Sequence, residues 1–224
     1  MPNDLLPPSF LFRFSLPLKR ISGDWPACVP LSDDHRLLNF TTLDDARQFA
    51  NVRAAWNQRG LLFSLEVSGK KQQPWCREGR LEESDGFHVW IDTRDTKNIH
   101  RASRFCHHFV FLPAGGGHRL DSPVAEQSLI NRARENAHPV RPGVLRVHSE
   151  KRVNGYTLDC LVPVEALTGF DADDYSRLGF FYAVVDREMG AQTLAYSGDF
   201  PYREDPSVWC SLELGLPDKK SLGN

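Results

Sequence analysis

The feature that most restricts how this chain can fold is an alternation of apolar and polar residues that recurs along most of its length. Successive side chains of a strand point to opposite faces, so a period of two is typical of β-structure with one buried face. Turn-forming residues lie between the alternating runs, as antiparallel strands joined by short loops require. The sequence therefore predicts a mostly β protein.

Two pairs of alternating runs predict β-hairpins. Residues 49–56 and 61–67 are separated by the short turn Asn57-Gln58-Arg59-Gly60. Residues 145–152 and 156–162 flank Asn154-Gly155, a dipeptide strongly associated with tight hairpin turns. Each pair is expected to place two neighbouring strands in one sheet.

Other runs predict further strands and little helix. The strands are expected over residues 9–16, 86–92, 105–112, 178–186 and 209–214, and the run 105–112 should end at Pro113 and the glycines 115–117. Residues 124–137 have a helix-forming composition and are expected to form a helix or a loop, because His138-Pro139 follows. Residues 44–50 and 164–167 are each expected to form a turn or two of helix.

The number of strands indicates how the domain is built. Eight or more strands without an internal repeat or linker favour two sheets packed face to face, because one open antiparallel sheet would leave an apolar face in water. We expect an all-β fold, a two-layer antiparallel β-sandwich of jelly-roll type with one or two short helices. It should form a single domain over residues 1–216, with a flexible tail at 217–224.

Composition restricts the partners and the compartment. The 27 Lys and Arg against 29 Asp and Glu give a net charge of -2, which argues against a nucleic acid partner. No apolar run approaches the roughly 20 residues of a membrane span, and the proline-interrupted N-terminus is a poor signal peptide. The five cysteines are odd in number, which disfavours secretion with a full disulfide set, and the absence of a C-x-x-C pair excludes a local zinc knuckle or thioredoxin-type motif. We therefore expect a cytoplasmic protein of bacterial type, with no membrane partner and no prediction for its oligomeric state.

Several blocks, in their order and spacing, resemble carbohydrate-binding module family 9, a group related to DOMON domains. The blocks are GLLFSLEV at 60–67, SDGFHVWIDTRD at 84–95, NGYTLDCLVPVEAL at 154–167, LGFFYAVVD at 178–186 and DPSVWCSLEL at 205–214. The family's acidic-aromatic strand D-x-x-E-x-W-I-D is matched by Asp85, Trp90 and Asp92, whereas His88 stands where an acid is common. The resemblance implies a jelly-roll-like sandwich. Its members bind sugar chain ends between two tryptophans and hold structural calcium, and its DOMON relatives bind haem or sugars.

The main candidate site lies on one face of the strand at 86–92. Alternation places His88, Trp90 and Asp92 together on the face opposite an apolar set. An indole can lie against the apolar face of a pyranose, while Asp92, Arg94 and Arg101 bond its hydroxyls. In the alternative interpretation, Trp90 packs under a loop and the three charged residues form a polar network that fixes that loop.

Aromatic residues on loops extend the candidate binding surface. Tyr196 and Tyr202 lie among prolines and glycines near the C-terminus, and Trp75 lies in the long loop 68–84. Long loops in compact domains are commonly functional, so all three are assigned to the rim of a ligand site. Trp209 opens the last strand and is expected in the core.

Metal and haem binding are kept as alternatives. The histidines near Cys106 offer ligands for zinc, copper or haem iron, although His107 and His108 should point to opposite faces, so at most one of them can join His88. Haem would need a second axial ligand such as Met189. The loop acids Asp171, Asp173, Asp174, Asp199, Glu204 and Asp205 could bind calcium, but no EF-hand pattern is present, and solvated acidic loops are the alternative.

No motif for catalysis is found. The chain lacks a G-x-S-x-G elbow, an H-E-x-x-H helix, a P-loop and a G-x-G-x-x-G turn. Cys76 is expected to be the exposed thiol, but it has no evident base. The sequence thus predicts a non-catalytic carbohydrate-binding-like module for a sugar or a similar polar ligand. A haem- or metal-binding DOMON-like module and an interaction domain without a small ligand remain the alternatives.

Overall fold

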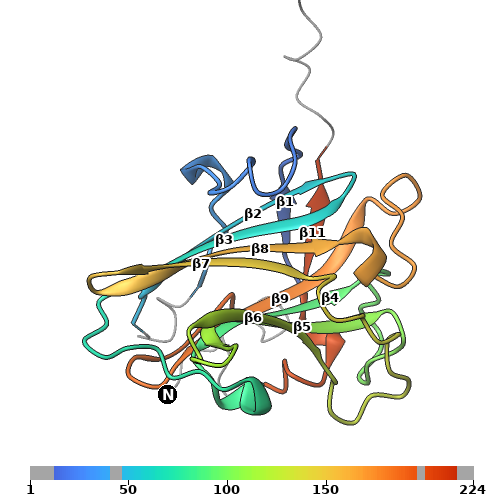
Figure 1. Cartoon of the computed structure of the whole chain (residues 1–224). Helices are drawn as coiled ribbons and strands as arrows, with labels where there is room; N and C mark the ends of the chain where they lie inside the picture. Colours follow the sequence, from blue (N-terminus) through green and yellow to red (C-terminus); the bar gives the residue numbers. More distant parts are fainter. Residues whose placement is uncertain (1–12, 41–46, 196–199, 216–224) are drawn as a thin grey trace, which may run out of the picture.

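The computed structural model describes residues 13–40, 47–195 and 200–215, which form a two-layer β-sandwich. Figure 1 shows strands β2, β3, β8 and β7 in one layer and β9, β4, β5 and β6 in the other. A seven-stranded sheet has the order β1-β11-β9-β4-β5-β6, with β10 paired to β9, and a four-stranded sheet has the order β2-β3-β8-β7. The predicted all-β sandwich is confirmed.

The smaller sheet consists of the two predicted hairpins. Its strands are β2 (Ala50–Asn57), β3 (Gly60–Ser68), β7 (Arg146–Arg152) and β8 (Gly155–Pro163). Both hairpins are antiparallel, and β3 pairs with β8 between them. Local turn chemistry was therefore a sound guide to strand pairing here.

The larger sheet joins segments that are distant in the sequence. Its strands are β1 (Ser15–Leu18), β4 (Gly86–Asp92), β5 (Cys106–Gly116), β6 (Ser122–Ser128), β9 (Arg177–Asp186), β10 (Gly190–Thr193) and β11 (Cys210–Leu214). All neighbours are antiparallel except β1 and β11, which are parallel. Strand β4 is central, between β5 and β9.

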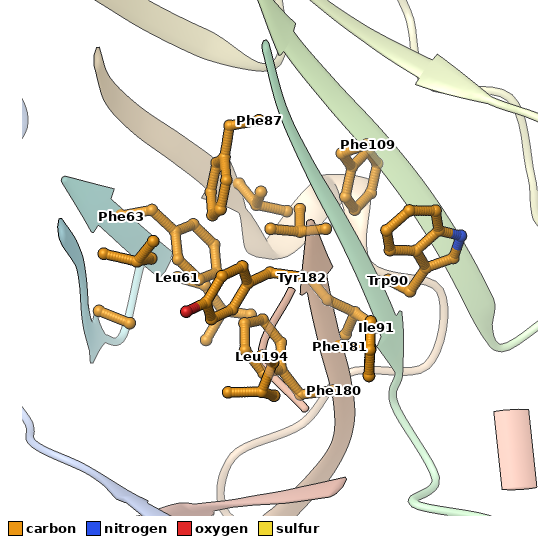
Figure 2. Close-up of a cluster of buried hydrophobic side chains, with 14 of the residues drawn as sticks. Leu61, Phe63, Phe87, Trp90, Ile91, Phe109, Phe180, Phe181, Tyr182 and Leu194 are labelled. Atoms are coloured by element: carbon orange, nitrogen blue, oxygen red, sulfur yellow. The ribbon is translucent and has the colours of Figure 1, made fainter. Parts of the chain in front are cut away.

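An aromatic core fills the space between the sheets. Phe63 of the smaller sheet lies edge-on to Phe87 of β4, with centroids 5.6 Å apart, and stacks on Phe180 of β9 at 5.9 Å. Figure 2 shows these rings together with Tyr182 in one buried cluster. Because this core takes one face of the larger sheet, the opposite face of that sheet must be covered by other segments or remain in contact with water.

Several predicted elements differ from the structure. Residues 124–137 do not form a helix: β6 occupies 122–128, and an irregular segment follows. Strand β5 continues past Pro113 to Gly116, with a register shift between Leu112 and Gly116. Hydrogen bonds to the neighbouring strand outweigh the helix-forming composition of the first segment and the turn formers of the second.

The remaining predictions concern short elements and the chain ends. Strand β1 begins at Ser15, and the predicted residues 9–12 lie outside the described part. The predicted helix at 44–50 falls largely outside it, and its described residues 47–49 are not helical. A single 3-10 turn, η5 (Val164–Ala166), agrees with the prediction, and the other such turns are η2 (Asp33–His35), η4 (Glu78–Glu83) and η6 (Pro206–Val208). The predicted tail at 217–224 lies outside the described residues.

Candidate functional site

The face of β4 that was expected to bind a ligand is covered. His88, Trp90 and Asp92 do lie opposite the core face of β4, but their side chains are only 0%, 1% and 1% exposed. The Trp90 indole stacks on His108 with centroids 4.3 Å apart and meets the ring of Tyr202 edge-on at 5.4 Å. The prediction of an open aromatic platform at Trp90 is therefore wrong, because segments distant in the sequence cover that face.

The histidines beside Trp90 are buried in neutral form. His88 Nδ1 and His108 Nε2 share a hydrogen bond of 3.1 Å, and the two rings stack at 5.3 Å. Burial lowers the pKa of His88 to about 3 and places the pKa of His108 well below its ordinary value. The Nε2 atom of His88 and the indole N–H of Trp90 have no hydrogen-bond partner among the described residues. This cluster serves packing and carries a cost in unpaired polar atoms.

The charged residues assigned to this face hold loops instead. Asp92 accepts hydrogen bonds from the backbone N–H of Arg94 at 2.9 Å and of Thr96 at 2.7 Å. Arg94 donates to the Gly169 carbonyl at 2.7 Å, and Arg101 donates to the Arg132 carbonyl at 2.8 Å. The packed Trp90 agrees with the alternative interpretation of the sequence, but Asp92, Arg94 and Arg101 bond to separate backbone groups and do not form the single network expected there.

Of the two predicted tyrosines, Tyr202 lies in the described part of the chain and does not form a rim. Tyr202 is 9% exposed and stacks on Phe181 with centroids 4.6 Å apart. Its assignment to a binding rim is therefore wrong, because the ring covers the outer face of the larger sheet. Tyr196 lies outside the described residues. Trp209 is fully buried, as predicted.

The two histidines of β5 and the Cys76 thiol are also buried. His107 and His108 point to opposite faces as expected, and His107 accepts a hydrogen bond from the backbone N–H of Thr168 at 3.1 Å. Within residues 13–40, 47–195 and 200–215, no group of three or more His, Cys, Asp or Glu side chains could hold a metal ion. Cys76 is buried, not exposed, and burial raises its pKa to about 12, so it is a poor nucleophile.

Among the predicted aromatic ligand residues in the described part of the chain, Trp75 stays partly open. It lies between β3 and β4, and its side chain is half-buried. Its backbone N–H donates to Asp85 Oδ2 at 3.0 Å, and the Asp85 backbone N–H donates to the Trp75 carbonyl at 2.8 Å. Asp85 also accepts the backbone N–H of Arg187 at 2.8 Å. One buried carboxylate thus fixes two loops side by side.

Beneath Trp75 lies a buried ionic network. Lys70 Nζ donates to Asp85 Oδ2 at 3.2 Å and to Asp186 Oδ2, and the three side chains are 2%, 2% and 0% exposed. Burial alone would lower the pKa of Lys70, but the hydrogen bond to Asp186 and the charge of Asp85 raise it overall, so the lysine is charged. The network ties three loops at this end of the sandwich.

Sequence reasoning missed this network, although a signal existed. Asp85 precedes β4 and Asp186 ends β9, and the antiparallel register pairs Gly86 with Val185. Two acids on adjacent strand ends need a cation when they are buried. Lys70, two residues after the end of β3, supplies this cation. It is distant from both acids along the chain, so the sequence did not indicate that the three side chains meet.

Two arginines lie on the Trp75 indole. The guanidinium carbon of Arg187 lies 4.5 Å from the ring centroid, and that of Arg77 lies 5.6 Å from it. Both arginine residues are exposed. The arrangement is a half-buried indole with two guanidinium groups over its ring, on a rigid support.

A separate groove lies at the open edges of the two sheets. It has a volume of about 840 Å³ and runs along β6 and residues 137–147. Its lining includes the half-buried Trp25 and polar side chains such as Glu126, Gln127, Arg141 and Arg146. Sequence analysis did not identify this groove, because β6 was not recognised as an edge strand.

Comparisons with known proteins place the fold. The chain is similar to a carbohydrate-binding module of family 9 from Caldicellulosiruptor kristjanssonii in complex with glucose, with TM-score 0.62 and 10% identity over 93% of this chain and 100% of the other. A family 9 module from this organism in complex with cellotriose has a TM-score of 0.59 and 9% identity, over 95% of this chain and 98% of the other. A protein from Bacteroides uniformis that is proposed to bind carbohydrate has a TM-score of 0.57 and 14% identity, over 90% of this chain and 99% of the other.

These similarities confirm the resemblance at the level of the fold. The chain has the β-sandwich of carbohydrate-binding module family 9. No protein-family model matches the sequence, and no curated protein matches it. No helix in the described ranges is both long and apolar enough to pass through a lipid bilayer.

Proposed function

We propose that this protein is a non-catalytic carbohydrate-binding module that holds a saccharide against Trp75. The observation that carries the proposal is a half-exposed indole whose backbone is fixed by the buried carboxylate of Asp85. Flat aromatic rings bind the apolar faces of pyranoses, and a rigid support lowers the entropy cost of binding. The proposed ligand site is therefore at Trp75, and not at the covered Trp90 that the sequence suggested.

The comparisons support this assignment at a coarse level. The two family 9 module structures from Caldicellulosiruptor kristjanssonii are complexes with glucose and with cellotriose, and they share the fold of this chain. Fold alone does not define function, and the support at the level of the site comes from the Trp75 surface. A haem- or metal-binding role has less support, since His88 and His108 bond to each other in a fully buried stack.

Isothermal titration of the full chain with glucose, cellotriose and a panel of other oligosaccharides tests the proposal. We expect saturable binding that is lost in Trp75→Ala and largely kept in Trp75→Phe. Trp25→Ala is the matched control, because Trp25 is also half-buried but lies on the groove at the sheet edges. Absence of heat at millimolar sugar would overturn the proposal.

The location and the lack of catalysis need separate measurements. Loss of binding in Trp25→Ala together with unchanged binding in Trp75→Ala would move the site to the groove. Incubating the protein with the bound oligosaccharide should release no new reducing ends. Turnover in that assay would contradict the assignment as a non-enzyme.

A further inference from the structure

We infer that the saccharide bound at Trp75 carries an anionic group, a carboxylate as in a uronic acid, or another oxyacid such as a sulfate. This inference rests on the proposed function and names the class of sugar. Its basis is a difference between two sets of charged groups: the carboxylates around Lys70 are bonded, whereas Arg77 and Arg187 are exposed.

The three carboxylates around Lys70 are already engaged. Asp85 accepts from Lys70 and from two backbone N–H groups, and Asp186 accepts from Lys70 and from the backbone N–H groups of Glu188 and Met189. Glu188 accepts the backbone N–H groups that follow Lys70, at 3.0 and 3.1 Å, and these bonds lower its pKa. These three carboxylates are therefore turned inward and occupied.

Lys70 is buried among these carboxylates, but two arginine side chains of the same region face outward. Arg77 and Arg187 are exposed, and neither forms an ion pair with a carboxylate among the described residues. Arg53 and Arg177, by contrast, lie against Asp33 and Asp95. The Arg77 side chain uses one N–H group to bond the Cys76 carbonyl at 2.9 Å. The guanidinium of Arg187 has no hydrogen-bond partner in the described part of the chain.

The geometry suits an oxyanion next to a sugar ring. A guanidinium that stacks on an indole keeps its N–H groups in its own plane, where a carboxylate or sulfate can accept two parallel hydrogen bonds. The planar fork of arginine matches these anions better than it matches single hydroxyls. A neutral pyranose would use the Trp75 surface but leave the Arg77 and Arg187 donors to water.

The test compares three monosaccharides on the full chain: methyl glucuronide, methyl glucoside and a glucose 6-sulfate. We expect the glucuronide to bind at least tenfold more tightly than the neutral glucoside at low salt, with the ratio falling as sodium chloride is added. The sulfate separates the two sources of negative charge. Preference for glucuronide over sulfate identifies a carboxylate site, and the reverse identifies a sulfated sugar, and both support an anionic ligand.

Variants locate the effect. Arg187→Gln and Arg77→Gln should each reduce the ratio of glucuronide affinity to glucoside affinity several-fold. Arg134→Gln is the matched control, because it removes one charge from an exposed arginine in the distant segment after β6. An equal loss in Arg134→Gln would show a general charge effect and overturn the inference.

Failure of this inference differs from failure of the proposed function. Glucoside binding at Trp75 with no preference for the anionic sugars would overturn the inference and leave the proposed function standing. Tight glucuronide binding that persists in Trp75→Ala would place the anion site elsewhere and overturn the inference. Absence of binding by all three sugars and by the neutral oligosaccharides would remove both.

Discussion

Trp90 and Trp75 differ in their exposure and in the groups packed against them. Trp90 is 1% exposed and stacks among neutral histidines, while Trp75 is half-buried above a charged network. Around Trp90 the polar atoms are few and partly unpaired, whereas beneath Trp75 every ion has a partner of opposite charge. The comparison teaches that the segments packed around an aromatic side chain decide whether it is open to a ligand.

The largest effect is expected from removing the cation of the network. Lys70→Met leaves Asp85 and Asp186 buried without a counter-charge, which should cost about 3 to 5 kcal/mol of the free energy of unfolding. Urea denaturation measures it. Lys71→Met is the control: Lys71 is exposed, and its replacement should stay within about 0.5 kcal/mol. Equal effects of the two variants would contradict the role of the network.

Truncating the covered tryptophan should come next. Trp90→Ala removes contacts to His108, Phe181 and Tyr202 and should cost about 3 kcal/mol, at the lower end for a buried aromatic because the covering loops can partly collapse. The midpoint of urea denaturation measures the loss. A change below about 1 kcal/mol would mean that the loops do not cover the indole in solution.

Acid should weaken the histidine region. The folded-state pKa values of His88 and His107 are about 3 and about 4, below the ordinary value of 6.5. Their contribution to stability is therefore complete above about pH 6.5 and falls as the pH drops, until the folded-state pKa values are reached. At about 1.4 kcal/mol per pH unit, each histidine should cost about 2 kcal/mol at pH 5.

Denaturation curves at pH 7.5, 6 and 5 test this expectation. His88→Phe should lessen the dependence on pH by about the share of one histidine, since its ring can keep the stack with Trp90. His118→Gln is the control, because His118 is exposed. If the unsubstituted protein became more stable as the pH was lowered from 6.5 to 5, these histidines would not be buried in neutral form.

The smallest effect on stability is expected at Trp75. Trp75→Ala should cost about 1 kcal/mol, because the side chain is only half-buried and its backbone bonds to Asp85 remain. The same variant should lose saccharide binding. Thermal or urea denaturation beside titration measures both, and a cost matching that of Trp90→Ala would make Trp75 a core residue and erase the contrast.

How much of this could be predicted follows from the range of the interactions. The hairpins depend on short turns such as Asn154-Gly155, so their strands and register were accessible from local sequence. Strand β6 was missed because its alternation is weak, with only Val124 buried, and pairing with β5 defines it. The faces of β4 were correctly separated.

The site was less predictable, because it depends on contacts between distant segments. Alternation placed Trp90 away from the core, but its cover includes Tyr202, more than a hundred residues later. Trp75 was selected from loop length alone, and nothing local indicated that Lys70 and Arg187 would meet near it. Sequence patterns thus identified the face of a side chain but not what lies above it.

The parallel pairing of β1 with β11 has a mechanical consequence. Ser15 lies opposite Ser211 and Leu18 opposite Leu214, and backbone bonds at 3.0 and 2.9 Å close the pair at Phe14 and Gly215. Tension applied between the segment before β1 and the segment after β11 would pull these strands past each other. All of their hydrogen bonds would then share the force at once, instead of opening one by one as in a zipper. The edge that joins the first and last strands would thus act as a clamp against stretching.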